Sequence, residues 1–521
     1  MSIILALVVF SVLVLFHEFG HFLLAKKNGI GVTEFSLGLG PRILSFEKGG
    51  TKYSWKLIPF GGSCAMVGED SEEEGENSFN SKSVWARISV VAAGPIFNFI
   101  LAFILAVIVI AMQGYDECKV VSVGNTESFM GAYFVSDERE CEVLAVAKDS
   151  MAYHAGFVEG DIIKNMNGTR IENGLSLRNA LKEDLSDTET IVFDILRDGN
   201  PKTIEYKTDD ETTEFVFKPS IETSAYQAGL RYGDVITEYD GENIVIGRDL
   251  WLYQYMYDVT EKEIPVTYER DGKEYDTVLI PQVRYSMGIS YNATNEPCIV
   301  RGISEGSAAE KAGIRVDDVI VSIRGEEVSS GEDMKNILEN SPLDAGTIEI
   351  VYQRDGKEET VTLTPKELYS VGFNFSTGYS KKGTPLQVIR YSFTELRYNV
   401  ECTLKSFYML FTGKVSTNDV SGPVGLVSIV GDAYDQSKSI GYRAVFINIA
   451  YLVILFSVNL GVLNLFPLPA LDGGRLVFLF IEAVRGKPVP RDKEAIVHFV
   501  GMILLMILMV LILFNDIGKL I

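Results

Sequence analysis

Five consecutive residues, His17-Glu18-Phe19-Gly20-His21, have the types and the spacing needed for metal chemistry. In a helix, a spacing of four places both imidazoles on one face, one turn apart, where the two can bind one zinc ion. The glutamate between them is the residue type that acts as general base in metal-dependent hydrolysis. The chain has only four histidines in 521 residues, so a chance match has a probability on the order of 0.002.

The run lies within an apolar segment, residues 3–25, in which no other side chain is ionisable. A charged residue at the centre of a bilayer costs about 2.5–3.5 kcal/mol. Ionisable residues in such a segment therefore indicate a function. The alternative is a signal peptide, which usually has a basic start and an Ala-x-Ala cleavage site. Here no Lys or Arg precedes Lys26, and no such site follows the segment.

Length and composition limit the class of protein. A chain of 521 residues is too long for one compact core, so several domains are expected. The net charge of −23 argues against nucleic acid as a partner and against a polybasic membrane-surface module. The five cysteines have no paired CxxC spacing, which argues against a zinc finger and a disulfide framework. A bridge between Cys118 and Cys141 is left open.

Four segments are long and apolar enough to span a bilayer, which takes about 20 residues; they are residues 3–25, 88–112, 444–465 and 495–514. The loop after the first segment and the loop before the last are rich in Lys and Arg. Such loops stay cytoplasmic, so the N-terminus, the central region and the C-terminus are expected outside. A shorter stretch, residues 404–411, is interrupted by Lys405 and is expected to form an amphipathic or interfacial helix.

The central region contains three similar units. Each has a short helical stretch ending in Gly, then a tight turn and an apolar strand, and later a hairpin turn of the type Arg-Asp-Gly. The hairpin turns are Arg197-Asp-Gly199, Arg270-Asp-Gly272 and Arg354-Asp-Gly356. The units resemble PDZ domains, which can take an extended peptide onto a sheet edge; their expected ranges are 115–210, 211–284 and 285–380. We expect a polytopic α-helical membrane protein with these α+β modules inserted between the second and third helices. Residues 1–112 and 381–521 then form the two halves of the membrane core.

Zinc catalysis usually needs a third protein ligand. The candidate is Asp472, which follows Pro467 and Pro469 at a break in the third apolar segment. Broken backbone at membrane depth is tolerated only inside protein or beside water. The alternative is that Asp472 caps a cytoplasmic helix. Helical rises of roughly 21 Å to His17 and roughly 30 Å to Asn464 place both motifs in the cytoplasmic half of the membrane. His498 has no accompanying motif, and we expect a packed or interfacial histidine.

Several motifs together resemble the site-2 protease family, in its bacterial regulator-of-sigma-E protease branch. They are HEFGH, Ala93-Gly94-Pro95-Ile96-Phe97-Asn98-Phe99, Ser421-Gly422-Pro423-Val424-Gly425, and the stretch from Asn459 to Gly474. The resemblance covers nearly the whole chain. It implies an intramembrane zinc metalloprotease with His17, His21 and Asp472 as ligands and Glu18 as general base. The family commonly has one or two PDZ domains, whereas this chain has three PDZ-like units.

The resemblance also implies how substrate is held. Asn459 and Asn464 are expected to contact it. Residues 53–59 with Gly61 and Gly62 resemble the family's membrane-reentrant hairpin, which presents substrate by strand addition. The expected partners are the lipid bilayer of the cell membrane and single-pass membrane proteins, such as an anti-sigma factor or a signal-peptide remnant. Neither nucleic acid nor a small-molecule substrate is expected.

Two other functions remain as alternatives. A non-catalytic membrane scaffold could recruit partners through its PDZ-like units, in which case Glu18 would be dispensable. An ion carrier could use the membrane-embedded His and Asp residues, but the transmembrane segments show no repeat symmetry to support it.

Overall fold

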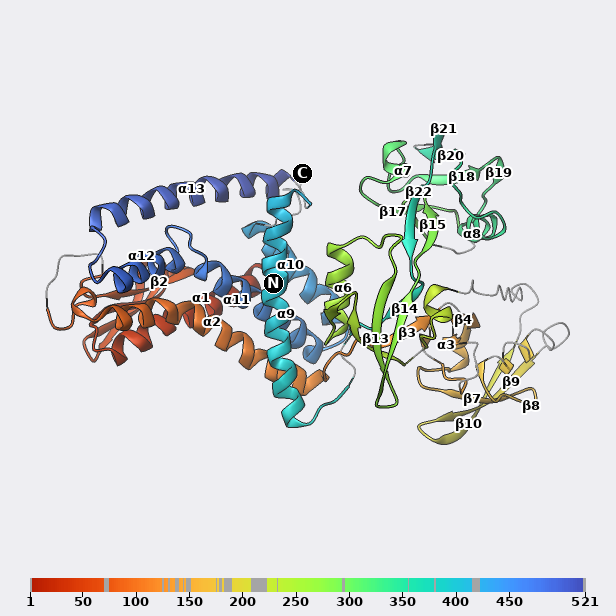
Figure 1. Cartoon of the computed structure of the whole chain (residues 1–521), viewed down its shortest axis with the longest axis horizontal. Helices are drawn as coiled ribbons and strands as arrows, with labels where there is room; N and C mark the ends of the chain where they lie inside the picture. The colour runs from red at the N-terminus through yellow and green to blue at the C-terminus, as the bar shows by residue number, and fades with distance from the viewer. Residues whose placement is uncertain are drawn as a thin grey trace. The chain divides into compact units, whose positions relative to one another are not determined.

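The computed structural model divides the chain into two compact units, residues 1–115 with 379–521 and residues 116–378 (Figure 1). It describes the chain except for residues 1, 70–74, 124–125, 130–131, 136–139, 144, 147–150, 175, 178–179, 182–189, 208–222, 232, 293–295, 355, 379–380, 415–421 and 519–521. Ser421, quoted above within a motif, is outside the described residues.

Four long apolar helices confirm the four predicted spans. They are α1 (Ser2–Lys27), α2 (Val84–Gln113), α11 (Tyr442–Leu465) and α13 (Arg491–Gly518). The α2 and α11 helices, far apart in sequence, share an apolar core that includes Ala102, Ala106, Ile454 and Val458. In contrast, α13 is largely exposed along its apolar length: the side chains from Leu504 to Leu511 are mostly accessible, as expected for a helix that faces lipid.

Three further helices complete the membrane unit: α9 (Pro385–Thr412), α10 (Pro423–Lys438) and α12 (Asp472–Arg485). The predicted short helix over 404–411 is the last part of α9. This helix begins at a capping box between Thr384 and Gln387 and ends where Gly413 adopts a left-handed conformation. Its length exceeds the expectation because its first half buries polar residues, among them Glu395 and Asn399, rather than showing an apolar run.

The loop after α1 forms a curled antiparallel hairpin of β1 (Val32–Lys48) and β2 (Thr51–Met66). Both strands bend, so residues 34–37 pair with 52–55 on one side and with 62–66 on the other. The spatial order is therefore 42–48, 51–56, 34–37 and 62–66, with Gly62 in the outermost segment. A 3-10 turn, η1 (Phe79–Ser81), follows, and Phe79 packs with the first residues of β1 in a core against α1, α2 and α12.

The second unit contains three four-stranded antiparallel sheets with the same strand order, β10-β9-β7-β8, β14-β13-β11-β12 and β21-β20-β18-β19. We call the corresponding substructures modules 1, 2 and 3. The strands are β7 (Ile162–Met166), β8 (Thr169–Arg170), β9 (Thr190–Arg197), β10 (Asn200–Lys207), β11 (Val235–Tyr239), β12 (Glu242–Asn243), β13 (Ile264–Arg270), β14 (Lys273–Leu279), β18 (Val319–Ile323), β19 (Glu326–Glu327), β20 (Ile348–Arg354) and β21 (Lys357–Leu363). Each sheet carries helices: α3 (Met151–Ala155) in module 1, α5 (Ser224–Gln227) and α6 (Gly247–Met256) in module 2, and α7 (Ala308–Lys311) and α8 (Gly331–Asn340) in module 3. The repeated order confirms three related α+β modules.

One buried ion pair recurs in every module. The arginine of each Arg-Asp-Gly turn binds both oxygens of the aspartate that precedes the first sheet strand, and donates to the glycine carbonyl that ends the short helix. The sets are Arg197–Asp161–Gly156, Arg270–Asp234–Gly229 and Arg354–Asp318–Gly313, with nitrogen–oxygen distances from 2.6 to 2.8 Å. The arginine thus ties the hairpin of each module to its helix–strand turn.

Module 2 draws its core from three separate parts of the chain. Alongside residues 225–279, the core contains Cys118 and Val120 from before module 1, and Val371 and Phe373 from after module 3. Strand β3 (Val120–Val123) pairs with β23 (Phe373–Phe375), as β17 (Val300–Ile303) pairs with β16 (Ile289–Tyr291) in module 3. The predicted ranges followed the order of the repeats along the chain; the structure differs because these short strands complete a module distant in sequence.

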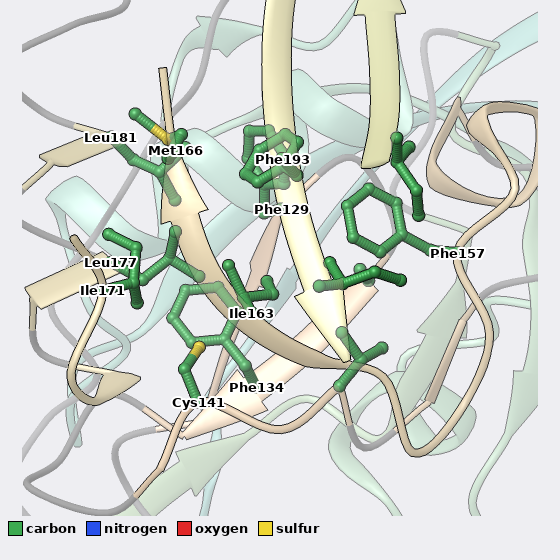
Figure 2. Close-up of a cluster of buried hydrophobic side chains, with 14 of the residues drawn as sticks. Phe129, Phe134, Cys141, Phe157, Ile163, Met166, Ile171, Leu177, Leu181 and Phe193 are labelled. Atoms are coloured by element: carbon green, nitrogen blue, oxygen red, sulfur yellow. The ribbon is translucent and has the colours of Figure 1, made fainter. Parts of the chain in front are cut away.

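Modules 1 and 3 have continuous cores. Strands β4 (Thr126–Phe129), β5 (Ala132–Val135) and β6 (Ala145–Val146) contribute Phe129 and Phe134 to the core of module 1, where Phe129, Phe157 and Phe193 lie together (Figure 2). The core of module 3 lies within residues 287–363. Strand β15 (Gln282–Ser286) precedes this segment in the chain and strand β22 (Lys366–Ser370) follows it, and the two strands pair with each other. Module 3 is therefore an insertion whose two connections run side by side.

Three of the five cysteines occupy equivalent positions in the modules. The carbonyls of Cys118, Cys141 and Cys298 each accept a backbone hydrogen bond from the second residue of the first sheet strand of the module, at 2.8–2.9 Å. All three are buried, and none of them forms a disulfide. Cys118 and Cys141 belong to different cores, so the structure has no bridge between them; they are packed as small apolar residues.

Candidate metal centre

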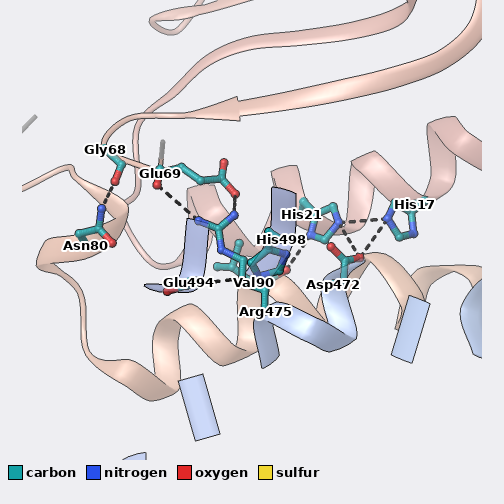
Figure 3. Close-up of polar contacts among 10 residues, drawn as sticks. All are labelled: His17, His21, Gly68, Glu69, Asn80, Val90, Asp472, Arg475, Glu494 and His498. Carbon is teal, nitrogen blue, oxygen red and sulfur yellow. Dashed lines mark hydrogen bonds and ion pairs between the residues drawn. The ribbon is translucent and has the colours of Figure 1, made fainter. Parts of the chain in front are cut away.

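The histidine pair lies on α1 with both imidazoles on one face, as its spacing predicts. The Nε2 atoms of His17 and His21 are 3.2 Å apart, and the rings meet edge to face. Their side chains turn away from lipid toward α2 and α12, and His21 is 8% exposed. The two nitrogens therefore point at one common position inside the membrane unit (Figure 3).

Asp472 brings the third group to this position. Its Oδ2 atom lies 3.2 Å from His17 Nε2 and 3.4 Å from His21 Nε2. The alternative was that Asp472 caps a helix. A helix, α12, does begin at Asp472, but its N-cap residue is Leu471. The carboxylate belongs to the first helical turn and is directed at the two imidazoles.

The spacing of the three atoms fits a metal ion. Two ligands at zinc distances of about 2.0–2.2 Å lie about 3.3–3.6 Å apart in a tetrahedral site. The three measured separations are 3.2, 3.2 and 3.4 Å, so the atoms form a nearly equilateral triangle of that size. Asp472 Oδ2 is buried without a hydrogen-bond partner among the described residues. An orphaned carboxylate oxygen facing two imidazoles is suited to a cation.

A close helix crossing makes room for the imidazoles. A β-carbon on Gly20 would lie 2.4 Å from the Ala93 carbonyl oxygen, and one on Gly94 would lie 2.3 Å from His21 Nε2 and 2.7 Å from His17 Cε1. Both glycines are thus required by the approach of α1 to α2. The Ala93-Gly94-Pro95 motif provides the α2 surface on which the histidines rest.

Two groups on α2 orient the rings. His21 Nδ1 lies 2.9 Å from the Val90 carbonyl, to which it donates when protonated there, leaving Nε2 free as a ligand. The Asn98 side-chain amide lies 3.2 Å from His17 Nδ1, and the Ser457 hydroxyl donates to the Asn98 backbone carbonyl at 2.8 Å. His21 thus presents an unprotonated Nε2 to the common position, as metal-binding histidines do. His17 does the same when the Asn98 side-chain amide is flipped, so that its oxygen, which is buried without a partner among the described residues, accepts from Nδ1–H.

Glu18 is a residue of α1, and its side chain faces the outermost segment of the hairpin, residues 62–66. A β-carbon on Gly62 would lie 3.1 Å from the Glu18 Cγ atom. Residue 62 must therefore be small for the hairpin to pass so near the general-base candidate. Gly61, its neighbour, has φ +85°, a conformation that favours glycine. The predicted hairpin residues thus lie beside the predicted catalytic residue.

The two asparagines predicted to hold substrate lie on the last turns of α11, both partly buried. The Thr403 hydroxyl of α9 donates to the Asn459 Oδ1 atom. His154, in α3 of module 1, is outside the unit that holds the metal position. His498 has a contact that the sequence did not suggest: its Nδ1 atom accepts the Ala470 backbone N–H at 2.9 Å.

A cavity of 1120 Å³ borders the site on the side of α12 and α13. Its walls carry two ion pairs, Arg87 with Glu482 and Arg475 with Glu69, and Asp472 and His498 also line it. A polar cavity that reaches Asp472 can admit the water that peptide hydrolysis consumes.

Comparison with known proteins identifies the family of the chain. The model of peptidase family M50 matches residues 5–508. The chain belongs to peptidase family M50. It is similar to the regulator of sigma-W protease RasP of Bacillus subtilis, with 27% identity over 100% of this chain and 99% of that one. It is also similar to the regulator of sigma-E protease RseP of Escherichia coli, with 28% identity over 99% and 98% of the two chains.

A further relative and one solved structure are also similar to this chain. The zinc metalloprotease RasP of Bacillus licheniformis is 28% identical over 100% of this chain and 99% of its own. Among solved structures, a PDZ domain protein from Parabacteroides distasonis aligns with 48% of this chain at 10% identity and a TM-score of 0.17. The protein is a site-2-type membrane metalloprotease with PDZ-like modules between its second and third membrane helices, as the sequence predicted.

Proposed function

We propose that this protease uses zinc held by His17, His21 and Asp472 to cleave peptide bonds within the transmembrane segments of single-pass membrane proteins. The observation that carries the proposal is the triangle of Nε2, Nε2 and Oδ2 atoms on and beside a membrane-length helix. When bound there, zinc would supply the Lewis acid that polarises the scissile carbonyl. Two imidazoles and one carboxylate leave the fourth position open, as catalytic sites require.

Glu18 acts as general base in this proposal. It precedes His21 by three residues, so the two side chains are neighbours on α1, while the group of clustered ligand atoms consists of His17, His21 and Asp472 and does not include its carboxylate. The proton that Glu18 takes from water can then pass to the amine that leaves the cleaved bond.

The hairpin presents the substrate. A peptide bond inside a helix is shielded by its own hydrogen bonds, so the substrate must unwind before cleavage. The segment of residues 62–66 is outermost in its sheet, and its edge can accept an extended strand. Gly61 and Gly62 keep this edge free of bulk beside Glu18, while Asn459 and Asn464 at the end of α11 bind the extended backbone.

The names of the relatives suggest the kind of substrate. RasP and RseP are named as regulators of sigma-W and sigma-E, so membrane-anchored anti-sigma factors are the first class to examine. Signal-peptide remnants are the second. The Lys- and Arg-rich short loops support a topology in which the metal position lies toward the cytoplasm and the PDZ-like modules lie outside the cell membrane.

The decisive experiment replaces Glu18 with Gln in the full-length protein. Cleavage of a single-pass reporter should fall at least about 100-fold, with zinc content unchanged. Asp472→Asn should lose both zinc and cleavage, whereas Glu47→Gln, which changes an exposed carboxylate of the hairpin, should lose neither. Cells with Glu18→Gln should accumulate uncleaved membrane stubs, which identify the natural substrates. Retained cleavage in Glu18→Gln would instead favour the non-catalytic scaffold.

A further inference from the structure

The turn that delivers Asp472 contains one residue in an unfavourable conformation. Ala470 has φ +75°, in the left-handed region that residues with a β-carbon rarely adopt. It lies two residues before Asp472, so the direction of the carboxylate depends on this backbone. Such a conformation persists only where surrounding contacts hold it.

The contacts that hold Ala470 in this conformation come from α13, a helix that is exposed along most of its length. The His498 Nδ1 atom accepts the Ala470 N–H at 2.9 Å. Three residues along the same helix, a β-carbon on Gly501 would lie 2.3 Å from the Pro469 Cβ atom. Residues 498 and 501 are on one face of the helix, and that face lies against the turn.

The turn also packs closely against the residues that precede and follow it in the chain. A β-carbon on Gly473 would lie 2.0 Å from the Phe466 carbonyl oxygen, and one on Gly474 would lie 2.4 Å from the Leu468 carbonyl oxygen. The backbone from Phe466 to Gly474 is therefore folded back on itself without spare space. A change in the conformation of Ala470 has to move the residues that follow it, and Asp472 is among the first.

We propose that His498 is a positioning residue for the metal centre: by accepting the Ala470 N–H, it holds the turn that aims Asp472 at His17 and His21. The inference rests on the proposed metal ligation. His498 is not assigned as a fourth ligand, because the ligand atoms that cluster among the described residues are those of His17, His21 and Asp472, and its Nδ1 atom already accepts a backbone hydrogen. Its ring also packs near Phe478, with centroids 5.6 Å apart, so packing alone is the competing explanation.

Two substitutions separate the hydrogen bond from packing. In His498→Asn, the side-chain Oδ1 atom occupies the place of Nδ1 and can accept the same N–H, although most of the ring is lost. In His498→Leu, the apolar volume is kept but no acceptor remains. Zinc affinity of the full-length protein, measured by competition with a chelator, should fall roughly 10-fold in His498→Leu and less than about threefold in His498→Asn.

A second-site change tests the cause. Glycine adopts a positive φ without strain, so Ala470→Gly reduces the need for His498. In the His498→Leu background, Ala470→Gly should recover most of the lost zinc affinity. Equal affinity in His498→Leu and the wild type, equal loss in the Leu and Asn variants, or no recovery with Ala470→Gly would each overturn the proposal.

The Asp472→Asn variant distinguishes this inference from the proposed function. If Asp472→Asn loses zinc while His498→Leu retains it, the ligand assignment stands and the positioning role fails. If Asp472→Asn keeps normal zinc affinity, the ligand assignment itself fails, and the positioning role fails with it.

Discussion

Gly94 gives His21 the space in which its imidazole lies: a β-carbon at position 94 would be 2.3 Å from the His21 Nε2 atom. Position 94 is in the interior of α2, where alanine is intrinsically about 1 kcal/mol more favourable than glycine. Helix propensity therefore favours alanine at position 94, whereas the space needed by the His21 imidazole favours glycine.

We expect Gly94→Ala to weaken zinc binding and cleavage strongly while α2 remains helical and inserted. The reason is that the added methyl group displaces the Nε2 atoms from their triangle with Asp472. Metal analysis and reporter cleavage measure the effect, and circular dichroism checks the helix. Gly518→Ala is the matched control, because a β-carbon there has no neighbour within 4 Å. Normal zinc content in Gly94→Ala would show that the imidazoles can move without losing the metal.

The local pattern predicted the three residues that the structure brings together, but the contacts that support them come from distant parts of the chain. Two histidines four residues apart define a helix face wherever the helix lies, and the Pro-rich break before Asp472 is visible in the sequence. The hydrogen bond from Ala470 to His498 is not, because it joins two segments that only packing brings together. The available signal for this contact was a histidine, a scarce residue in this chain, within an apolar helix. That signal did not indicate which backbone N–H donates to the imidazole.

In the modules, too, features set by neighbouring residues were predicted, whereas contacts between residues far apart in the sequence were not. The turn signals were confirmed: Asn167, Asp240 and Arg324 all have positive φ before a glycine. The pairing of each turn arginine with an aspartate 36 residues earlier was missed, although both residues were visible in every repeat. The composition of module 2 could not be predicted, since strands as short as β3 and β23 carry too little pattern to identify a partner so far along the chain.

The Asp318–Arg354 pair should make the stability of module 3 depend on pH. Burial disfavours ionisation of Asp318, but hydrogen bonds from the Arg354 side chain and the Arg315 backbone outweigh it and hold its pKa below the ordinary value. Such a carboxylate stabilises the fold above the unfolded-state pKa of about 3.9, and this contribution is lost as pH falls through the lower folded-state pKa.

We therefore expect Asp318→Asn to destabilise module 3 by about 1–3 kcal/mol at pH 7, with the difference from wild type narrowing below about pH 4. Hydrogen exchange of the β18 and β20 amides in the full-length protein, corrected for intrinsic exchange rates, measures both effects. Asp317→Asn, which changes the exposed neighbouring carboxylate, is the control and should behave as wild type. A difference that stays constant down to pH 3 would mean that ionisation of Asp318 is not the cause.

The native cysteines are poor reporters of which side of the membrane each loop occupies. Cys64, Cys118 and Cys298 are buried, and burial raises the pKa of the Cys298 thiol to about 11. Burial likewise raises the pKa values of the Cys64 and Cys118 thiols. These thiols should react slowly with maleimides, so new cysteines at exposed positions can be introduced against a low background once the partly exposed Cys402 is changed to Ser.

We expect Glu326→Cys, in module 3, to react with a membrane-impermeant maleimide in intact cells. Lys48→Cys, near the hairpin turn, should react only after the membrane is opened. Both positions are exposed, so accessibility depends on the side of the membrane rather than on burial. The expectation follows from the Lys and Arg content of the two short loops. The reverse pattern would invert the topology and place the metal position toward the outer face.

The paired connections of module 3 allow it to be removed cleanly. Ser286 and Lys366 are opposite each other at the ends of β15 and β22, and the core of module 3 lies wholly between them. Replacing residues 287–365 with Asn-Gly should join the two strands as a hairpin with a two-residue turn. The cores of modules 1 and 2 use no residue from the removed segment, so zinc content and the exchange protection of β11 and β13 should stay unchanged.

This excision tests whether the modules filter substrates by size. If module 3 excludes bulky substrates, the excised protein should cleave a reporter that still carries a large outer domain, while cleavage of a short-stub reporter changes little. If module 3 is instead a receptor, cleavage of the natural substrate should weaken and the bulky reporter should remain uncut. We expect the first result, because the three modules share the Arg–Asp framework but no common ligand-binding motif. The same excision combined with Glu18→Gln is the control for background proteolysis. Continued rejection of the bulky reporter, with zinc content intact, would contradict a filtering role for this module.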